Sequence, residues 1–177
     1  MLEPSARTRP LIMARADAPF GTKKDMPKAQ DFHNRGADRI EQGQVSAAVL
    51  EYQKALSLDP DSLDTRIDLA WALIVLGRYA EARRELDHVL RKDPLHARAH
   101  RNLGVLYAKQ GNNLLAEKEL LESVRLDPTD ANTFYNLAVL YFLTGKKDLA
   151  KNTLKTAASL DPLDARVRSL LKKLLAK

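Results

Sequence analysis

The chain of 177 residues contains no cysteine. This absence excludes disulfides, thiolate metal sites and cysteine nucleophiles. Aromatic residues make up only 6% of the chain, with a single tryptophan, and the apolar residues are mainly Ala and Leu, which favours helices over strands. No window approaches the roughly 18 uncharged apolar residues of a membrane span. We therefore expect a helical, cytoplasmic protein without a membrane span.

Sequence patterns of enzyme active sites are missing as well. There is no Walker loop, no dinucleotide-binding glycine pattern and no nucleophile elbow. His96 and His100 are four residues apart, but His96 is expected in a turn and no third ligand accompanies the pair, so we expect no metal site. We expect a protein that is not an enzyme and that uses no cofactor.

The net charge of +6 is concentrated at the two ends of the chain. Residues 1–28 hold six basic and three acidic groups, residues 165–177 hold five basic and no acidic groups, and the middle is near neutral. A nucleic-acid-binding surface would gather its positive charge along the folded part, so we expect no nucleic-acid partner. Residues 1–28 include four prolines and are expected to form a flexible basic N-terminal tail.

Three residue types recur at intervals of 34 residues. Asp-Pro pairs stand at 59–60, 93–94, 127–128 and 161–162. The other two series are Gly43, Gly77, Gly111 and Gly145, and Ala48, Ala82, Ala116 and Ala150. Glycine adopts the left-handed conformation that ends a helix, and the residue before proline avoids the helical region. Each unit is therefore predicted to hold two helices, the first ending at the glycine and the second at the Asp-Pro.

Small residues also occupy the eighth place of every unit. They are Gly36, Ala70, Gly104 and Ala138, and the periodic alanines occupy the twentieth place. A larger side chain at either place would push two helix backbones apart. We expect these places to be points of close approach between helices.

The third unit carries the most complete repeat pattern. Its residues are His100, Leu103, Gly104, Tyr107, Ala116, Leu120, Ser123 and Pro128. With these residues the chain resembles the tetratricopeptide repeat family. The resemblance implies an all-α, right-handed superhelical α-solenoid of four repeats followed by a C-terminal capping helix. The repeats are expected at 29–62, 63–96, 97–130 and 131–164, and the capping helix at 165–177.

The two ends of the repeat region depart from the pattern in ways that suit capping units. Arg35 and Arg39 stand where the pattern has Leu and Tyr, and a first repeat has no earlier neighbour to cover that face. In the last helix, the four leucines 170, 171, 174 and 175 are expected to be buried, with the basic side chains facing water.

The resemblance places the binding surface on the concave face, which the first helices line. It implies that places 2, 5, 6, 9, 12 and 13 of each unit point into this face. The peptide-binding residues expected there are Asn34, Ile67, Asp68, Trp71, Arg98, Arg101, Asn102, Val105, Tyr135, Asn136, Val139 and Phe142.

Two features of this set have alternative explanations. The sixth places form a series of short polar groups, Asn34, Asp68, Asn102 and Asn136. An amide can pair with the main chain of an extended peptide, or it can satisfy carbonyls of a neighbouring helix. Trp71 and its apolar neighbours can anchor a partner, or the curvature of the superhelix can bury them.

The predicted function is a non-catalytic protein–protein interaction module, an adaptor or assembly factor that binds a peptide segment in the concave groove. Arg98 and Arg101 could attract an acidic stretch of that segment. The basic clamp by which some family members grip a terminal carboxylate is broken here by Ala37 and Asp68. The alternative is a self-assembling scaffold whose groove accepts its own tail or a neighbouring copy, so a homo-oligomer stays open. A third option is a regulatory fragment of a larger enzyme system.

Overall fold

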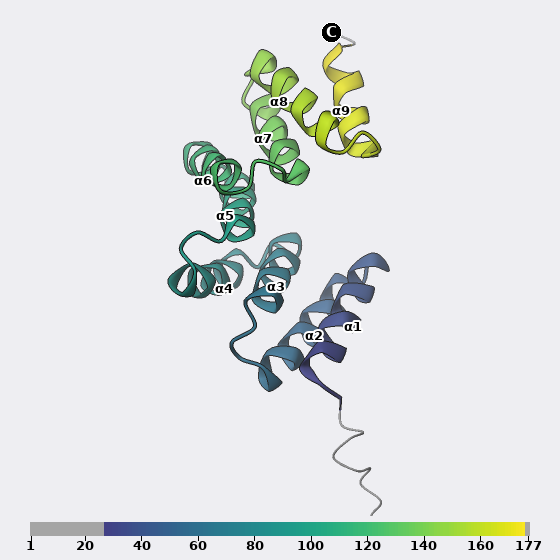
Figure 1. The fold of residues 1–177 in the computed structure, drawn as a ribbon, viewed down its shortest axis with the longest axis vertical. Coiled ribbons are helices and arrows are strands. Elements are labelled where there is room, and N and C mark those ends of the chain that lie inside the picture. Colours follow the sequence, from purple (N-terminus) through teal and green to yellow (C-terminus); the bar gives the residue numbers. More distant parts are fainter. Residues whose placement is uncertain (1–26, 176–177) are drawn as a thin grey trace, which may run out of the picture.

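The computed structural model describes residues 27–175, in which the regular structure is entirely helical. The helices are α1 (Ala29–Glu41), α2 (Val45–Leu58), α3 (Leu63–Val75), α4 (Tyr79–Lys92), α5 (Ala97–Lys109), α6 (Asn113–Leu126), α7 (Ala131–Leu143), α8 (Lys147–Leu160) and α9 (Ala165–Leu175). Helices α1 to α8 form four hairpin-like pairs that stack along an arc, and α9 follows at the end (Figure 1). The prediction of an all-α, right-handed superhelical α-solenoid is confirmed. The predicted tail lies outside the described residues except for Pro27 and Lys28.

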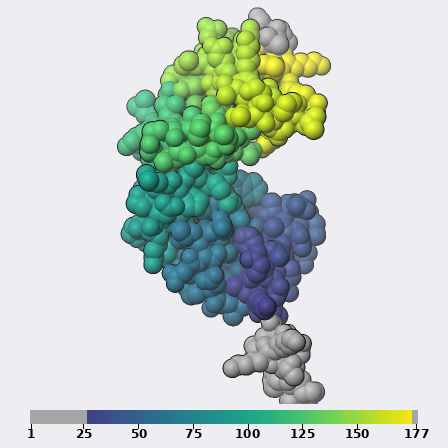
Figure 2. Space-filling view, in the orientation of Figure 1, coloured from purple at the N-terminus to yellow at the C-terminus, as the bar shows by residue number. Residues whose placement is uncertain are grey.

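The arc leaves a hollow on one side of the molecule. The space-filling view shows an indentation between the C-terminal part and the first helix pair (Figure 2). Helices α1, α3, α5 and α7 are the first helices of their pairs, and the second helices lie on the outer side of the arc (Figure 1). None of the helices within residues 27–175 combines the length and apolarity needed to cross a membrane.

The periodic glycines end the first helices, as predicted. Gly43, Gly77, Gly111 and Gly145 have φ angles of 72°, 75°, 78° and 77°. At each turn the N–H after the glycine donates to a carbonyl five residues earlier, as from Asn112 to Tyr107 at 2.9 Å. This six-to-one hydrogen bond is that of a Schellman motif, which closes a helix end when a residue at C′ is left-handed. The four turns therefore share one geometry.

The Asp-Pro pairs end the second helices, and the aspartate takes part in the turn. Asp93 has φ −135° and ψ 91°, which is the extended conformation that a following proline imposes. Its side chain then accepts the N–H of Leu95 at 3.1 Å. Asp59, Asp127 and Asp161 each accept the N–H two residues later in the same way. Such Asx turns are a reason for aspartate, as well as proline, to recur here.

The predicted points of close approach are buried. Gly36 and Gly104 are buried, and Ala70, Ala138 and the four periodic alanines are 0% exposed. A Cβ atom added at Gly104 would lie 2.6 Å from Cγ of Leu120 and 3.1 Å from the carbonyl oxygen of Ala116. Helices α5 and α6 therefore pack with no room for a methyl group between them.

The two ends of the solenoid differ in what covers them. On α1, Arg35 stays exposed, lies 4.2 Å from the ring centre of Phe32 and pairs with Glu51. On α9, Val167 and Leu170 are buried against the end of the last pair. Leu171 and Leu174 are partly buried and the lysines between them are exposed. The side chain of Leu175 lies outside the described part.

Replacing Gly104 with Ala should destabilise the fold, although Ala is the better helix former by about 1 kcal/mol. Overpacking against Leu120 should lower the free energy of unfolding by about 1–3 kcal/mol, measured by chemical denaturation followed by circular dichroism. In a Leu120→Ala background only the 3.1 Å approach to the carbonyl oxygen of Ala116 remains, so the same change should cost much less. A loss of the same size in both backgrounds would contradict this packing.

Candidate functional site

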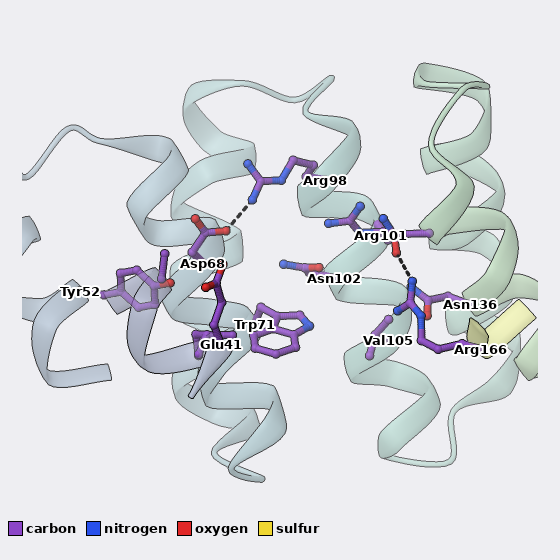
Figure 3. Close-up of a pocket in the computed structure, with 13 residues that line it drawn as sticks. Glu41, Tyr52, Asp68, Trp71, Arg98, Arg101, Asn102, Val105, Asn136 and Arg166 are labelled. Atoms are coloured by element: carbon purple, nitrogen blue, oxygen red, sulfur yellow. Dashed lines mark hydrogen bonds and ion pairs between the residues drawn. The ribbon is translucent and has the colours of Figure 1, made fainter. Parts of the chain in front are cut away.

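The concave side of the solenoid contains a cavity of about 460 Å³, here called the polar cavity. Its walls come from the four first helices, from α2 and from α9. The lining residues are Ala37, Ile40, Glu41, Tyr52, Asp68, Trp71, Arg98, Arg101, Asn102, Val105, Asn132, Asn136 and Arg166. Figure 3 shows these side chains gathered around one space.

A polar network joins the N-terminal halves of α1, α3 and α5. Arg98 of α5 donates to Asp68 at 2.5 Å and to Asp64 at 3.1 Å, both on α3. His33 of α1 approaches the other oxygen of Asp68 at 3.7 Å, and its Nδ1 lies 3.0 Å from the hydroxyl of Thr65. One carboxylate therefore contacts side chains from two neighbouring first helices.

A second ion pair fixes α5 against the start of α7. Arg101 donates to Asp130, the N-cap residue of α7, at 2.6 Å, and the two side chains are 17% and 15% exposed. The hydroxyl of Thr133 also donates to Asp130, at 2.7 Å. Burial alone would raise the pKa of Asp130, but the hydrogen bond from Thr133 and the charge of Arg101 hold it below its ordinary value of 3.8.

Helix α9 contributes Arg166 to the same cavity. Its Nη2 donates to the side-chain oxygen of Asn132 on α7 at 2.7 Å, and its guanidinium lies 4.9 Å from the ring centre of Tyr135. It also pairs with Asp164, just before the start of its own helix. The capping helix is therefore part of the concave surface as well as a cover for the end of the core.

Two less polar hollows adjoin the polar cavity at the C-terminal halves of the first helices. The α3–α5 hollow, of about 460 Å³, is lined by Trp71, Ile74, Val75, Leu76, Gly77, Tyr79, Val105 and Lys109. The α5–α7 hollow, of about 260 Å³, is lined by Val105, Ala108, Lys109, Leu120, Tyr135, Asn136, Val139, Leu140 and Leu143.

Trp71 and Val105 lie where these three spaces meet. Val105 lines all of them, and Trp71 lines the polar cavity and the α3–α5 hollow. The Trp71 side chain is 38% exposed, and Val75, one turn further along α3, is 51% exposed. A large apolar surface is thus open to solvent beside the charged network.

Nine of the twelve predicted site residues line these spaces, whereas Asn34, Ile67 and Phe142 do not. The prediction that Ile67 faces the groove is wrong, because its side chain is 0% exposed within the core that joins α2 to α5. Phe142 is also not at a lining position, because it packs between Tyr141 and the cluster around Leu154. Neighbouring helices thus cover Ile67 completely and Phe142 in part.

The four sixth-place residues do not share one environment. Asn34 is exposed on α1, accepts a hydrogen bond from Gln30 and lines none of the three spaces. Asp68 is held by Arg98. Asn102 is 1% exposed and donates to the carbonyl of Ile67 at 3.3 Å, so at this place the amide satisfies a neighbouring helix. Asn136 borders two of the spaces.

Two residues that line the polar cavity, Tyr52 and Arg166, lie outside the places of the four units that were predicted to point into the groove. Tyr52 reaches the cavity from α2 because Gly36 leaves room for its ring, since a Cβ there would come within 2.5 Å. Burial and the charge of Asp68 raise the pKa of Tyr52 to about 12. Arg166 occupies the second place of the unit that starts at residue 165, the same place as Asp64 and Arg98. Extending the numbering of places from the four repeats into the last helix would have predicted Arg166 as a groove residue.

The pair between Arg101 and Asp130 should contribute to acid sensitivity. Because the pKa of Asp130 is depressed in the folded chain, its contribution to stability is complete above its ordinary value and is lost as the pH falls through the folded value. Asp130→Asn should cost about 1–3 kcal/mol at neutral pH and should flatten the fall in stability below about pH 4, as measured by urea denaturation across pH. Asp61→Asn, at a side chain that is 84% exposed, is the control. Equal pH profiles for wild type and Asp130→Asn would contradict the assignment.

Solved structures share this architecture. TTC0263, a thermophilic TPR protein of Thermus thermophilus, superposes with a TM-score of 0.78 at 22% identity, over 84% of this chain and 81% of that one. The pilF protein of Pseudomonas aeruginosa gives a TM-score of 0.70 at 25% identity, over 84% of this chain and 68% of that one. These likenesses establish the fold.

Sequence comparison establishes the family. The chain is 33% identical to the TPR repeat-containing thioredoxin TTL4 of Arabidopsis thaliana over 87 residues, which is 49% of this chain but only 13% of that protein. The chain thus spans a small part of this longer relative. A family model described as tetratricopeptide repeat matches residues 39–106 and 107–174. The chain belongs to the tetratricopeptide repeat family, whose fold typically serves as a protein–protein interaction module.

Proposed function

We propose that the chain binds a peptide segment of a partner protein on its concave face and acts as a non-catalytic adaptor or assembly factor. The observation that carries the proposal is the partly exposed Trp71 at the junction of the polar cavity and the α3–α5 hollow. Exposed apolar surface beside ordered polar groups is typical of interaction sites, and tryptophan is a frequent anchor.

The surroundings of Trp71 support a peptide rather than a small molecule as the ligand. The three spaces form a continuous surface that extends across α3, α5 and α7, with Val105 in common. Side-chain amides of Asn132 and Asn136 stand on the α7 side and can donate to and accept from a peptide main chain. An elongated ligand can contact all three spaces at once.

Trp71→Ala should weaken peptide binding by about thirty-fold, the effect of losing a hot-spot side chain of roughly 2 kcal/mol. The ligands are synthetic peptides selected on the full chain from a random phage-displayed library, with dissociation constants measured by calorimetry. Such a selection requires no knowledge of the natural partner.

Leu121→Ala is the matched control, because Leu121 is a 46% exposed apolar residue on α6, away from the three spaces. It should leave the affinity unchanged. If no selected peptide loses affinity on Trp71→Ala, the concave-face site is refuted. If the full chain instead shows a mass that rises with concentration, and Trp71→Ala abolishes the rise, the occupant is a second copy and the scaffold alternative replaces the adaptor.

A further inference from the structure

The charges around the polar cavity are separated along the solenoid. The carboxylates of Glu41 and Asp68 come from α1 and α3, whereas the guanidiniums of Arg98, Arg101 and Arg166 come from α5 and α9. Figure 3 shows the two acids on the side of Tyr52 and Trp71, with Arg101 and Arg166 on the opposite side near Asn136. The lining as a whole carries one more positive than negative charge, and the excess lies toward α9.

The arginines toward α9 keep hydrogen-bond donors for a ligand. Arg101 uses Nη1 for Asp130, and within the described residues no hydrogen bond engages its Nε or Nη2. Arg166 uses Nε and Nη2 for Asp164 and Asn132, while its Nη1 is unengaged within residues 27–175. A guanidinium has five N–H donors, so holding one carboxylate leaves capacity to hold another. The Arg166 side chain is also 56% exposed and therefore reachable.

An apolar row runs beside this charged row. Charged and amide groups occupy the second and sixth places of the units, as Asp64 and Asn136 do, and Arg101 adds a charge at the fifth place of the third unit. In the second to fourth units, the ninth and thirteenth places hold Trp71, Val75, Val105, Val139 and Leu143, with Lys109 among them. Places two and nine lie seven residues apart on one helix, or roughly 10 Å. A segment lying in the groove thus meets charge along one edge and apolar surface along the other.

We infer that the partner segment is acidic and amphipathic, and this inference rests on the proposed function. Its large apolar side chains contact Trp71, Val105 and the two hollows. Its carboxylates face Arg101 and Arg166, and Glu41 and Asp68 repel negative charge from the α1 end. The groove thereby selects the chemistry of the segment and also the end of the solenoid at which its acidic part lies.

Arg166→Gln tests this directly, with Arg168→Gln as the matched control. Both residues are exposed arginines of α9 and both changes remove one positive charge, but only Arg166 lines the polar cavity. The probes are a fluorescein-labelled acidic peptide from the phage-displayed library and the same peptide with every Glu and Asp changed to Gln or Asn. Arg166→Gln should weaken the acidic peptide about five- to ten-fold, while Arg168→Gln leaves it within about two-fold.

Comparison of the acidic and neutral peptides shows whether Arg166 contacts the ligand directly or only holds α9 in position. If Arg166 contacts ligand carboxylates, Arg166→Gln should not weaken the neutral peptide, and raising the salt concentration should weaken only the acidic one. An equal loss for both peptides would mean that Arg166 only positions α9, and would overturn the inference. Selected peptides that depend on Trp71 but carry no acidic residues would overturn it too, while leaving the proposed function intact.

A peptide of residues 1–26 completes the test. It carries five basic and three acidic side chains, so an acid-selective groove should bind it at least about ten-fold more weakly than the acidic probe. Tight, Trp71-dependent binding of the 1–26 peptide would overturn the inference in favour of self-recognition. If no peptide of any charge depends on Trp71, the proposed function itself fails.

Discussion

The fixed length of each helix pair is the constraint on which the rest of this structure depends. Left-handed glycines end the first helices and extended Asp-Pro turns end the second ones, so every first helix begins 34 residues after the previous one. Equal units stacked in register bring equivalent places side by side. Asp64 contacts Arg98, and Asn132 contacts Arg166, each across one full unit. Local turn chemistry thus determines which distant residues meet.

Because the units stack in register, the repeat in the sequence produces a concave surface with a charged edge and an apolar edge. Residues near the starts of α3, α5 and α7 form a row of charged and amide groups, and residues about two turns later on these helices form a largely apolar row. The small eighth-place residues allow the helices of a pair to approach closely, and at Gly36 they let Tyr52 pass from α2 into the cavity wall. The close packing of the helices and the pattern of the concave surface therefore both follow from the same 34-residue repeat.

The fold could be predicted from sequence because its signals are local and repeated. The positive φ at Gly77 and the end of α4 before Asp93 can each be predicted from the residue itself and its immediate neighbours in the sequence. The site was less predictable, because exposure depends on how strongly the stack curves. Ile67 and Trp71 are four residues apart on one helix, yet one is fully buried and the other 38% exposed. The long side chains of Arg101 and Arg166 form hydrogen bonds with residues outside their own helices. The repeat pattern alone does not predict which residue such a flexible side chain contacts.

The central claim is that Trp71 is the solvent-exposed part of a peptide-binding groove, and its fluorescence tests this most directly because the chain has no other tryptophan. Acrylamide quenching of the full-length chain, without and with a saturating selected peptide, measures the accessibility of that one side chain. The account predicts efficient quenching in the free chain, strong protection in the complex and a blue shift of the emission. Unchanged quenching and emission at a peptide concentration that calorimetry shows to be saturating would contradict it.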